Sequence, residues 1–236
     1  MPGWFITGTD TGVGKTVIAG ALAMLLREHN RKVAVFKPVA TGCRRDVRLG
    51  LASEDAEFLA HCAESDATLE TINPVRYGGD VAPMIAAEHT RKPVDWEAID
   101  QSWCRLRASA DWVLVEGAGG LLVPVDPKNN MADLAKRFNL PLIIVARPGL
   151  GTINHTLLTI EAARTRGLPI SGVVINGYRP DSATLAEETN PEVIARLAKI
   201  SMPLIAPFDA RTDLRQGLVG ETLLHALRPF VERALG

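Results

Sequence analysis

Residues 8–16 read Gly8-Thr9-Asp10-Thr11-Gly12-Val13-Gly14-Lys15-Thr16, and this segment sets the architecture expected of the whole chain. It follows a short apolar run, Trp4-Phe5-Ile6, and it opens a segment with apolar residues at helical spacing. A glycine-rich turn between a strand and a helix is the setting of a phosphate-binding loop, where backbone N–H groups and the helix N-terminus face an anion. The sequence therefore predicts a phosphate site, with Lys15 reaching the β- and γ-phosphates and the Thr16 hydroxyl binding Mg²⁺.

The glycine spacing departs in one respect from the common phosphate-loop pattern. That pattern has a glycine five positions before Gly14, where this chain has Thr9, and the glycine lies one position earlier, at Gly8. The alternative is a flexible turn that contains Gly-Lys-Thr by chance. The preceding strand, the lysine, the hydroxyl and the following helix all favour the phosphate loop.

Length and composition limit the classes of protein to which the chain can belong. With 236 residues, 47% of them hydrophobic, we expect a folded α/β protein, and we assign residues 1–236 to a single domain. The net charge of −1 and the absence of a long basic run argue against nucleic-acid binding. No apolar run approaches the roughly 20 residues that span a bilayer, and no signal peptide is evident, so we expect a cytoplasmic protein without a membrane partner. Three scattered cysteines fit neither a disulfide framework nor a zinc site.

Apolar runs with the character of buried strands alternate with helical segments along the chain. This alternation predicts an α/β fold like that of the P-loop NTPases, with a mostly parallel central sheet of about seven strands and helices on both faces. Residues 43–52 are expected to form a charged loop, and Thr152 is expected to cap the helix that it begins. The clearest strands are expected at residues 4–6, 32–37, 112–116, 141–146, 170–176 and 203–207, and the clearest helices at 95–106, 131–138, 152–166, 191–200 and 219–235.

Polar residues lie at or just beyond the predicted strand ends. Lys37, Thr41, Glu116 and Asn176 each follow an apolar run, and Thr16 follows the first one through the glycine-rich turn. Because the carboxyl ends of parallel strands meet at one edge of a sheet, we expect these side chains to lie near the phosphate loop.

Plainer interpretations of the charged residues remain open from the residues alone. Lys37 and Glu116 suit solvated strand ends, and Asp55, in the first turn of a helix that Ser53 caps, suits the helix dipole. However, a carboxylate at the end of an apolar strand is expensive to bury without a partner, and the glycines after Glu116 permit a close ligand. Residue chemistry thus predicts a nucleoside triphosphatase with acids near a metal and a second lysine, but no substrate.

Five segments together resemble one family, the ATP-dependent dethiobiotin synthetases. They occur in the order and at the spacing of that family, and they cover the chain up to about Asn176. The displaced glycine at Gly8 is also that family's variant of the loop. The segments are Gly8 to Thr16, Lys37-Pro38-Val39-Ala40-Thr41-Gly42, Ser53-Glu54-Asp55-Ala56, Trp112-Val113-Leu114-Val115-Glu116-Gly117-Ala118-Gly119-Gly120 and Gly151-Thr152-Ile153-Asn154-His155.

The resemblance implies a reaction in biotin biosynthesis. An amine of 7,8-diaminopelargonic acid takes up CO₂ as a carbamate, and the carbamate oxygen attacks the γ-phosphate of ATP to give a carbamic–phosphoric anhydride. The second amine then closes the ureido ring and expels phosphate, with ADP as the other product. Carbamate and triphosphate are both anions, so two lysines and Mg²⁺ are needed to hold them in line.

The resemblance also implies roles for individual residues. Lys15 and Lys37 flank the transferring phosphoryl group, and Thr11 contacts the substrate amine or carbamate. The implied metal ligands are Thr16, Asp55 and Glu116. The implied ATP-binding residues are Gly12, Val13, Gly14, Lys15, Thr16, Val17, Asp55, Glu116, Gly117, Ala118, Gly119, Asn176, Gly177 and Pro207. The implied substrate-binding residues are Thr41, Leu150, Gly151, Thr152 and Asn154, of which the last four reach the substrate carboxylate across a homodimer interface.

The resemblance thins beyond Asn176. Where the family often has Gly-Glu-Ile-Pro, this chain has Leu204-Ile205-Ala206-Pro207, so the preference for adenine is expected to be looser. Two other functions fit the sequence less well. A partitioning ATPase usually has an extra lysine in the early loop, where this chain has Asp10, and the ATP-using domain of a cobalamin-pathway amidase needs a glutaminase domain, for which the chain up to Gly236 has no room.

Overall fold

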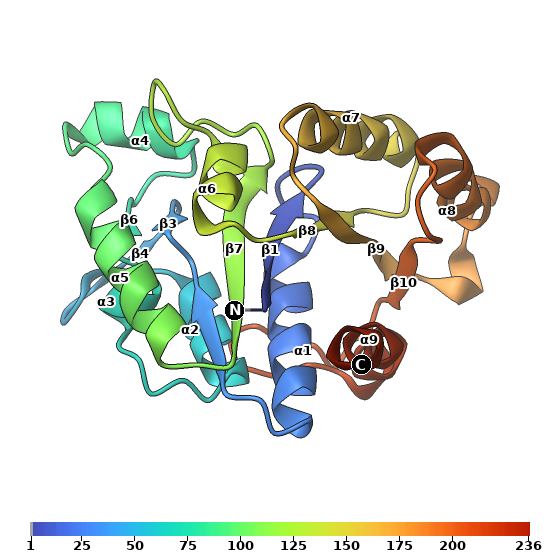
Figure 1. Ribbon diagram of the computed structural model, residues 1–236, viewed down its shortest axis with the longest axis horizontal. Helices are drawn as coiled ribbons and strands as arrows, with labels where there is room; N and C mark the ends of the chain where they lie inside the picture. Colours follow the sequence, from blue (N-terminus) through green and yellow to red (C-terminus); the bar gives the residue numbers. More distant parts are fainter. Residues whose placement is uncertain (1) are drawn as a thin grey trace.

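A computed structural model, which describes residues 2–236, shows a central sheet of six strands in the order β10-β9-β8-β1-β7-β2 (Figure 1). Every neighbouring pair in this sheet is parallel. The predicted α/β fold with a mostly parallel sheet is therefore confirmed. The strands are β1 (Gly3–Gly8), β2 (Val33–Phe36), β7 (Trp112–Gly120), β8 (Leu142–Ala146), β9 (Ile170–Tyr178) and β10 (Leu204–Pro207).

The central sheet has six strands where about seven were expected, because shorter strands pair outside it. After Pro38, which has no N–H to continue a sheet ladder, the chain forms β3 (Val39–Ala40), and this strand pairs in parallel with β6 (Val75–Arg76). The predicted loop at residues 43–52 is instead an antiparallel hairpin of β4 (Arg44–Asp46) and β5 (Gly50–Ala52).

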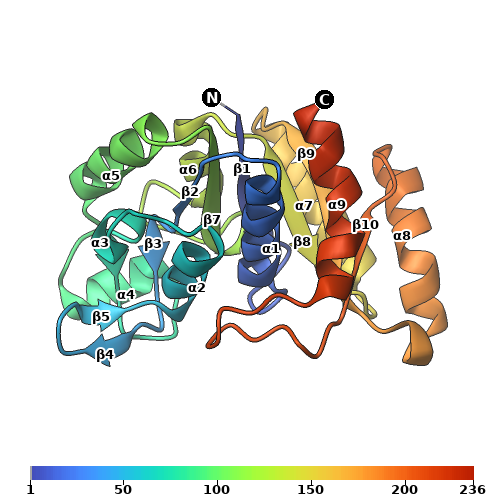
Figure 2. The same cartoon turned by 90° about the horizontal axis from the view of Figure 1, so that it is seen from below.

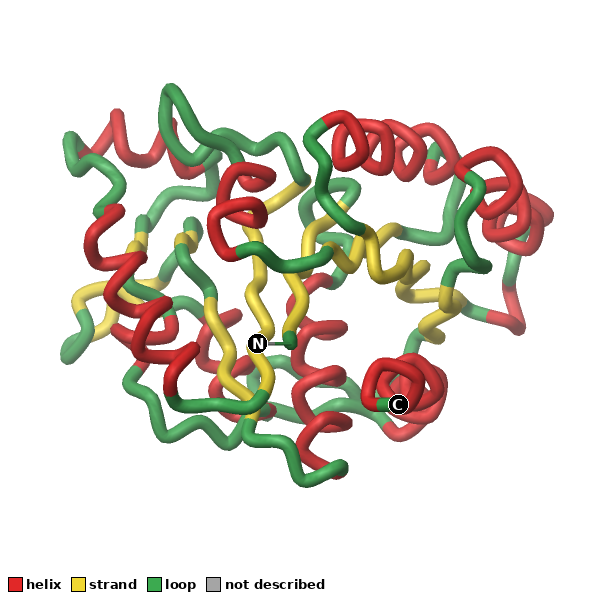
Figure 3. The backbone as a smooth tube through the Cα atoms, viewed as in Figure 1, coloured by secondary structure: helices red, strands yellow, loops and turns green. Residues whose placement is uncertain are grey.

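Helices cover both faces of the sheet, and two apolar cores result (Figure 3). Successive residues of a strand point to opposite faces, so in β1 Trp4 and Ile6 join the core beneath α1, α2 and α9, whereas Phe5 joins the core beneath α5, α6, α7 and α8. The helices are α1 (Lys15–Glu28), α2 (Glu54–Cys62), α3 (Leu69–Ile72), α4 (Pro83–Thr90), α5 (Trp96–Ala108), α6 (Met131–Phe138), α7 (Thr152–Thr165), α8 (Leu185–Ala198) and α9 (Glu221–Leu235).

The cap of α7 and the start of α8 differ from the sequence-based expectation. The cap position of α7 is occupied by Gly151 at φ 92°, and Thr152 is the first helical residue with a buried hydroxyl that has no partner, so the prediction of Thr152 as the cap is wrong. Helix α8 begins at Leu185, six residues before the predicted start. There the Thr184 side chain accepts from the Glu187 N–H and Glu187 accepts from the Thr184 N–H, which fixes the first turn upstream of Pro191.

The segment between β10 and α9 runs back across the carboxyl end of the sheet toward α2 (Figure 2). Leu214 of this segment lines the same cleft as the phosphate loop, and Gly217 packs against His61 so closely that a Cβ atom would lie 2.2 Å from its ring. The segment therefore forms part of the wall of that cleft. None of the helices within residues 2–236 combines the length and the apolar character needed to cross a bilayer.

Candidate active site

The phosphate loop takes a conformation that its glycines favour. Gly12 and Gly14 have φ values of 72° and 90°, in the left-handed region. Gly14 occupies the cap position of α1 and supplies no side chain to bond the first turn. The N–H groups at the start of α1 are therefore free to bind an anion, at the positive end of the helix dipole.

Asn176, at the end of the apolar part of β9, holds the phosphate loop in place. Its Nδ2 donates to the Val13 carbonyl oxygen over 3.0 Å. A Cβ atom on Gly14 would lie 2.0 Å from the same nitrogen. The structure thus brings Asn176 to the loop, as its place at the sheet edge predicted.

Side-chain alternation along the strands places the charged residues on one face. Val33 and Val35 of β2 and Trp112 and Leu114 of β7 belong to the core beneath α1. Because side chains alternate between the two faces of a strand, Lys37 and Glu116 also point to the α1 side, where Thr16 lies.

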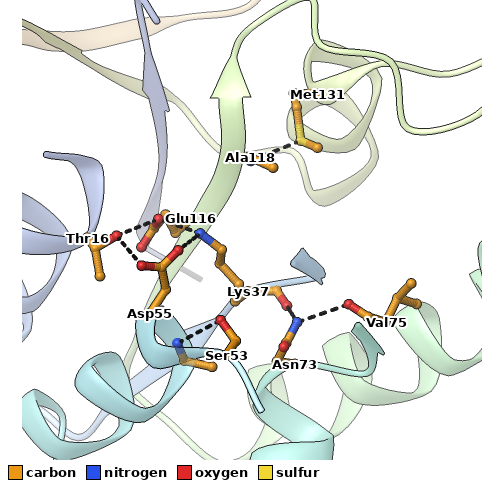
Figure 4. A network of polar contacts seen from close by, with 10 residues as sticks. Thr16, Lys37, Ser53, Asp55, Asn73, Val75, Glu116, Ala118 and Met131 are labelled. Carbon is orange, nitrogen blue, oxygen red and sulfur yellow. Dashed lines mark hydrogen bonds and ion pairs between the residues drawn. The ribbon is translucent and has the colours of Figure 1, made fainter. Parts of the chain in front are cut away.

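These side chains form a compact polar network (Figure 4). The Lys37 Nζ lies 2.6 Å from the Asp55 Oδ2 and 2.6 Å from the Glu116 Oε1. The Thr16 Oγ1 lies 3.0 Å from the Asp55 Oδ1 and 2.9 Å from the Glu116 Oε1. Lys37 and Glu116 are only 4% and 1% exposed, which rules out the solvated strand ends that the sequence left open.

The charges in the network depend on one another. Burial works against the ammonium of Lys37, but the carboxylates of Glu116 and Asp55 outweigh it and raise the pKa of Lys37 above its usual value. Burial also opposes the carboxylate of Asp55, yet Lys37 and the Thr16 hydrogen bond lower the pKa of Asp55. Burial lowers the pKa of Lys15, an effect that the nearby carboxylate of Glu116 opposes. The site therefore holds a fixed cation between two acids.

Backbone contacts fix Lys37 and Asp55 in these positions. The Lys37 N–H donates to the Ile72 carbonyl over 2.8 Å, and the buried Asn73 Nδ2 donates to the Lys37 carbonyl over 2.6 Å. Asp55 lies in the first turn of α2, where Ser53 is the predicted cap and accepts from the Ala56 N–H. The contribution of Asn73 was missed, because the sequence around it has no periodic pattern.

Glu116 was predicted to lie at a strand end, and this prediction is wrong. Strand β7 continues through the glycines to Gly120, with an irregularity in its pairing to β1 between Ile6 and Gly8. Glycines lack the β-branched or aromatic side chains that usually indicate a strand, so the sequence suggested a turn. Glu116 consequently projects from the middle of a strand, where its backbone is rigidly held.

The residues present fit a magnesium ion. Thr16, Asp55 and Glu116 offer oxygen ligands, which Mg²⁺ prefers, and the Glu116 Oε2 is buried without a hydrogen-bond partner. Within residues 2–236 there is no group of three His, Cys, Asp or Glu side chains that would hold a metal by itself. A site of this kind needs substrate phosphate and water to complete it, as is usual for Mg²⁺ in phosphoryl transfer.

A cleft of about 780 Å³ surrounds the network. Several predicted site residues line it. Val13, within the phosphate loop, and Asn176, which donates to its carbonyl, are not among them, and Pro207 lies at the end of β10 beside Tyr178. The predicted residues in the cleft wall are Thr11, Gly12, Gly14, Lys15, Thr16, Val17, Lys37, Thr41, Asp55, Glu116, Ala118 and Gly119.

Other predicted residues lie apart from this cleft within one chain. Leu150 is 90% exposed, Gly151 and Asn154 are also exposed, and they lie at the start of α7 beyond β8. Gly117 is buried in β7, where a Cβ atom would lie 3.0 Å from the Phe5 ring.

Residues that the sequence did not indicate complete the cleft wall. They come from the segment before α4 and the first residue of α4, from the loop after β7 and from the segment before α9. None lies in a periodic apolar run or a recognisable motif, so only the fold reveals them. They are Asp80, Val81, Ala82, Pro83, Val123 and Leu214.

Comparison with known proteins relates the whole chain to enzymes of one name. A family profile described as AAA domain matches residues 3–214. The ATP-dependent dethiobiotin synthetase BioD of Bacillus subtilis subsp. natto is 40% identical over 235 residues, which cover 100% of this chain and 97% of that protein. The ATP-dependent dethiobiotin synthetase BioD of Thermodesulfovibrio yellowstonii is 37% identical over 229 residues, 94% of each chain.

Solved structures show the same fold at low identity. The MinD cell division protein of Aquifex aeolicus superposes with a TM-score of 0.62 at 15% identity, over 100% of this chain and 98% of that one. A ParA family ATPase of Chlorobium tepidum superposes with a TM-score of 0.56 at 17% identity, again over 100% and 98%. At these identities the likeness extends to the fold alone.

Proposed function

The chain belongs to the dethiobiotin synthetase family, and from this premise we propose that residues 1–236 act as one P-loop domain that converts 7,8-diaminopelargonic acid, CO₂ and ATP into dethiobiotin, ADP and phosphate. One observation of the site carries the proposal. Lys37 directly follows β2, whereas the phosphate loop follows β1, and the Lys37 ammonium lies among the same acids that face Thr16. A second buried cation at that place suits a reaction that brings two anions together.

The side chains divide the work between nucleotide and carbamate. The N–H groups at the start of α1 and Lys15 hold the β- and γ-phosphates. Lys37 exchanges its carboxylate partners for the carbamate and the γ-phosphate, whose negative charges repel each other. Thr11 and Thr41, both in the cleft wall, hold the amine and carbamate end of the substrate. Catalysis then depends on position and charge, because the attacking group is the carbamate oxygen of the substrate itself.

Thr16, Asp55 and Glu116 would hold Mg²⁺, which supplies charge neutralisation for the transferring phosphoryl group when bound. Asn176 keeps one amide hydrogen and its carbonyl oxygen free of the Val13 contact, so it retains the groups needed to read the edge of a base. Pro207, with Gly177, borders that place from the ends of β10 and β9.

The substrate carboxylate is held by a second copy of the chain. Leu150, Gly151, Thr152 and Asn154 lie at the N-terminus of α7, which favours an anion, but they do not line the cleft of their own chain. A homodimer that places α7 of one subunit over the cleft of the other resolves this separation. The exposed side chain of Leu150 would then be covered by the partner.

The direct test measures ADP release with diaminopelargonate, bicarbonate, ATP and Mg²⁺, with each component omitted in turn. We expect turnover only in the complete mixture and dethiobiotin as a product by mass spectrometry. ADP release that does not depend on the diamine would contradict the proposal and would favour a nucleotide-dependent switch.

A further inference from the structure

Asp80 lies in the wall of the candidate active-site cleft although no sequence pattern points to it. Its position follows from hydrogen bonds that extend the short β3–β6 pairing. The Tyr77 N–H donates to the Ala40 carbonyl over 2.9 Å, and the Gly42 N–H donates to the Gly79 carbonyl over 3.0 Å. These bonds fasten the turn that carries Asp80 alongside Thr41.

Asp80 is exposed, and its carboxylate lies beside the α-carbon of Gly42. A Cβ atom on Gly42 would lie only 2.2 Å from the Asp80 Oδ1, so any other residue at position 42 would displace this carboxylate. Gly42 also has a φ of 68°, which favours glycine independently. The backbone is therefore shaped to bring the carboxylate close to Thr41, the residue assigned to the substrate.

Asp80 differs from the other acids of the cleft in its partners. Asp55 and Glu116 both accept from Lys37 and face Thr16. Within residues 2–236, the Asp80 carboxylate takes part in no hydrogen bond or ion pair, although it faces the cleft. The formal charges of Lys15, Lys37, Asp55 and Glu116 sum to zero, and Asp80 adds one negative charge to the cleft wall.

We propose that Asp80 binds the ammonium group of the diamine substrate that does not become the carbamate. The inference rests on the proposed function, because only a substrate with a second amine gives this carboxylate a partner. One nitrogen, as the carbamate, goes toward Lys37, and the other, as the ammonium, goes toward Asp80 and Thr41. Asp80 thereby orients the substrate and selects diamines over monoamines, since a charge-assisted bond is lost when the second amine is missing.

The test compares the wild-type protein with Asp80→Asn, which removes the charge and keeps the shape. We expect the KM for diaminopelargonate to rise about tenfold, because one charge-assisted hydrogen bond in a solvent-accessible cleft is lost. The KM for ATP should stay within about twofold, since the neighbour of the Asp80 carboxylate is Gly42, beside Thr41, and not a residue of the phosphate loop. The diamine KM of the wild type should also rise with salt concentration more steeply than that of Asp80→Asn.

Two controls make the result specific. Asp181→Asn removes an exposed acid from the short turn at Pro180–Ser182, outside the cleft, and should change neither KM. Asp80→Glu keeps the charge and should recover part of the diamine affinity. A diamine KM within about twofold of wild type in Asp80→Asn, or equal rises in both KM values, would overturn the role of Asp80. A wild-type protein that does not turn over the diamine at all would instead overturn the proposed function, and this inference with it.

Discussion

Lys37 links the stability of the apoprotein to its chemistry. Its ammonium forms ion pairs with two carboxylates, of which one, Glu116, is 1% exposed and has an oxygen without a hydrogen-bond partner among residues 2–236. Removing one member of a buried ion pair leaves the other charge uncompensated, which costs more than the pair itself contributes. The same ammonium is the one proposed to move to the phosphate and carbamate.

Lys37→Met should destabilise the protein in a pH-dependent way. Burial raises the pKa of Glu116 from 4.5, and loss of the Lys37 charge will raise it further. When the pKa of an acid is higher in the folded state than in the unfolded state, the protein loses stability as the pH rises above the unfolded-state pKa. The free energy of unfolding should be only slightly below the wild-type value near pH 4 and about 3 kcal/mol below it at pH 8, measured by urea denaturation.

A lysine outside the network serves as the control for this experiment. Lys136→Met changes an exposed residue in the last turn of α6 and should give the same small difference at both pH values. A loss in the free energy of unfolding of Lys37→Met that is constant between pH 4 and pH 8 would show that the charge of Glu116 is not its cause.

The same substitution should separate binding from catalysis. Lys37→Met is expected to lower kcat at least about a hundredfold, because the ammonium opposes charge that gathers as carbamate and γ-phosphate approach. The affinity for ATP should change little, since Lys15 and the start of α1 remain. Steady-state kinetics and nucleotide titration measure the two quantities, and a near-normal kcat would remove Lys37 from the chemistry.

At the scale of elements, the close packing of α1 on α2 holds the phosphate loop and Asp55 together. Gly20 of α1 faces α2 so closely that a Cβ atom would lie 2.3 Å from the Phe58 ring and 2.9 Å from the Cys62 Sγ. Both neighbours are buried, so neither has room to retreat.

Gly20→Ala should therefore destabilise the protein, although alanine favours a helix by about 1 kcal/mol over glycine. Overpacking of a filled core costs about 1–3 kcal/mol, and we expect a net loss of about 1 kcal/mol in the free energy of unfolding. The test is a double-mutant cycle with Phe58→Leu, which makes space beside position 20. Independent, additive effects of the two substitutions would show that the Gly20–Phe58 contact is not the cause.

The elements were predictable where one local pattern determines them. The phosphate loop, the buried strands and α6 follow from glycine positions and apolar periodicity, and the meeting of Lys37 with Glu116 follows from the parallel order of strands. Asp80 was not predictable, because its place depends on hydrogen bonds between the short strands β3 and β6. The start of α7 at Thr152 was predicted, but its cap was not, since Gly151 holds the cap position in the left-handed conformation.

At the scale of the whole molecule, one chain provides the cleft with the phosphate loop, and the start of α7 lies apart from that cleft. Asn154 is exposed, and it is absent from the cleft that contains Lys37 and Thr41. If α7 acts on the cleft of a second subunit, each complete site contains residues from two chains. Subunits that are defective in different residues then complement each other.

Co-expression of Lys37→Met and Asn154→Ala chains tests this arrangement. Asn154→Ala alone should raise the KM for the diamine more than the KM for ATP, and Lys37→Met alone should be nearly inactive. In a mixed dimer, one site combines the intact Lys37 of one chain with the intact Asn154 of the other, whereas the second site carries both defects. Random pairing then gives about a quarter of the wild-type activity at low diamine concentration. A mixture that shows only the average of its two parents would place Asn154 outside the partner's site.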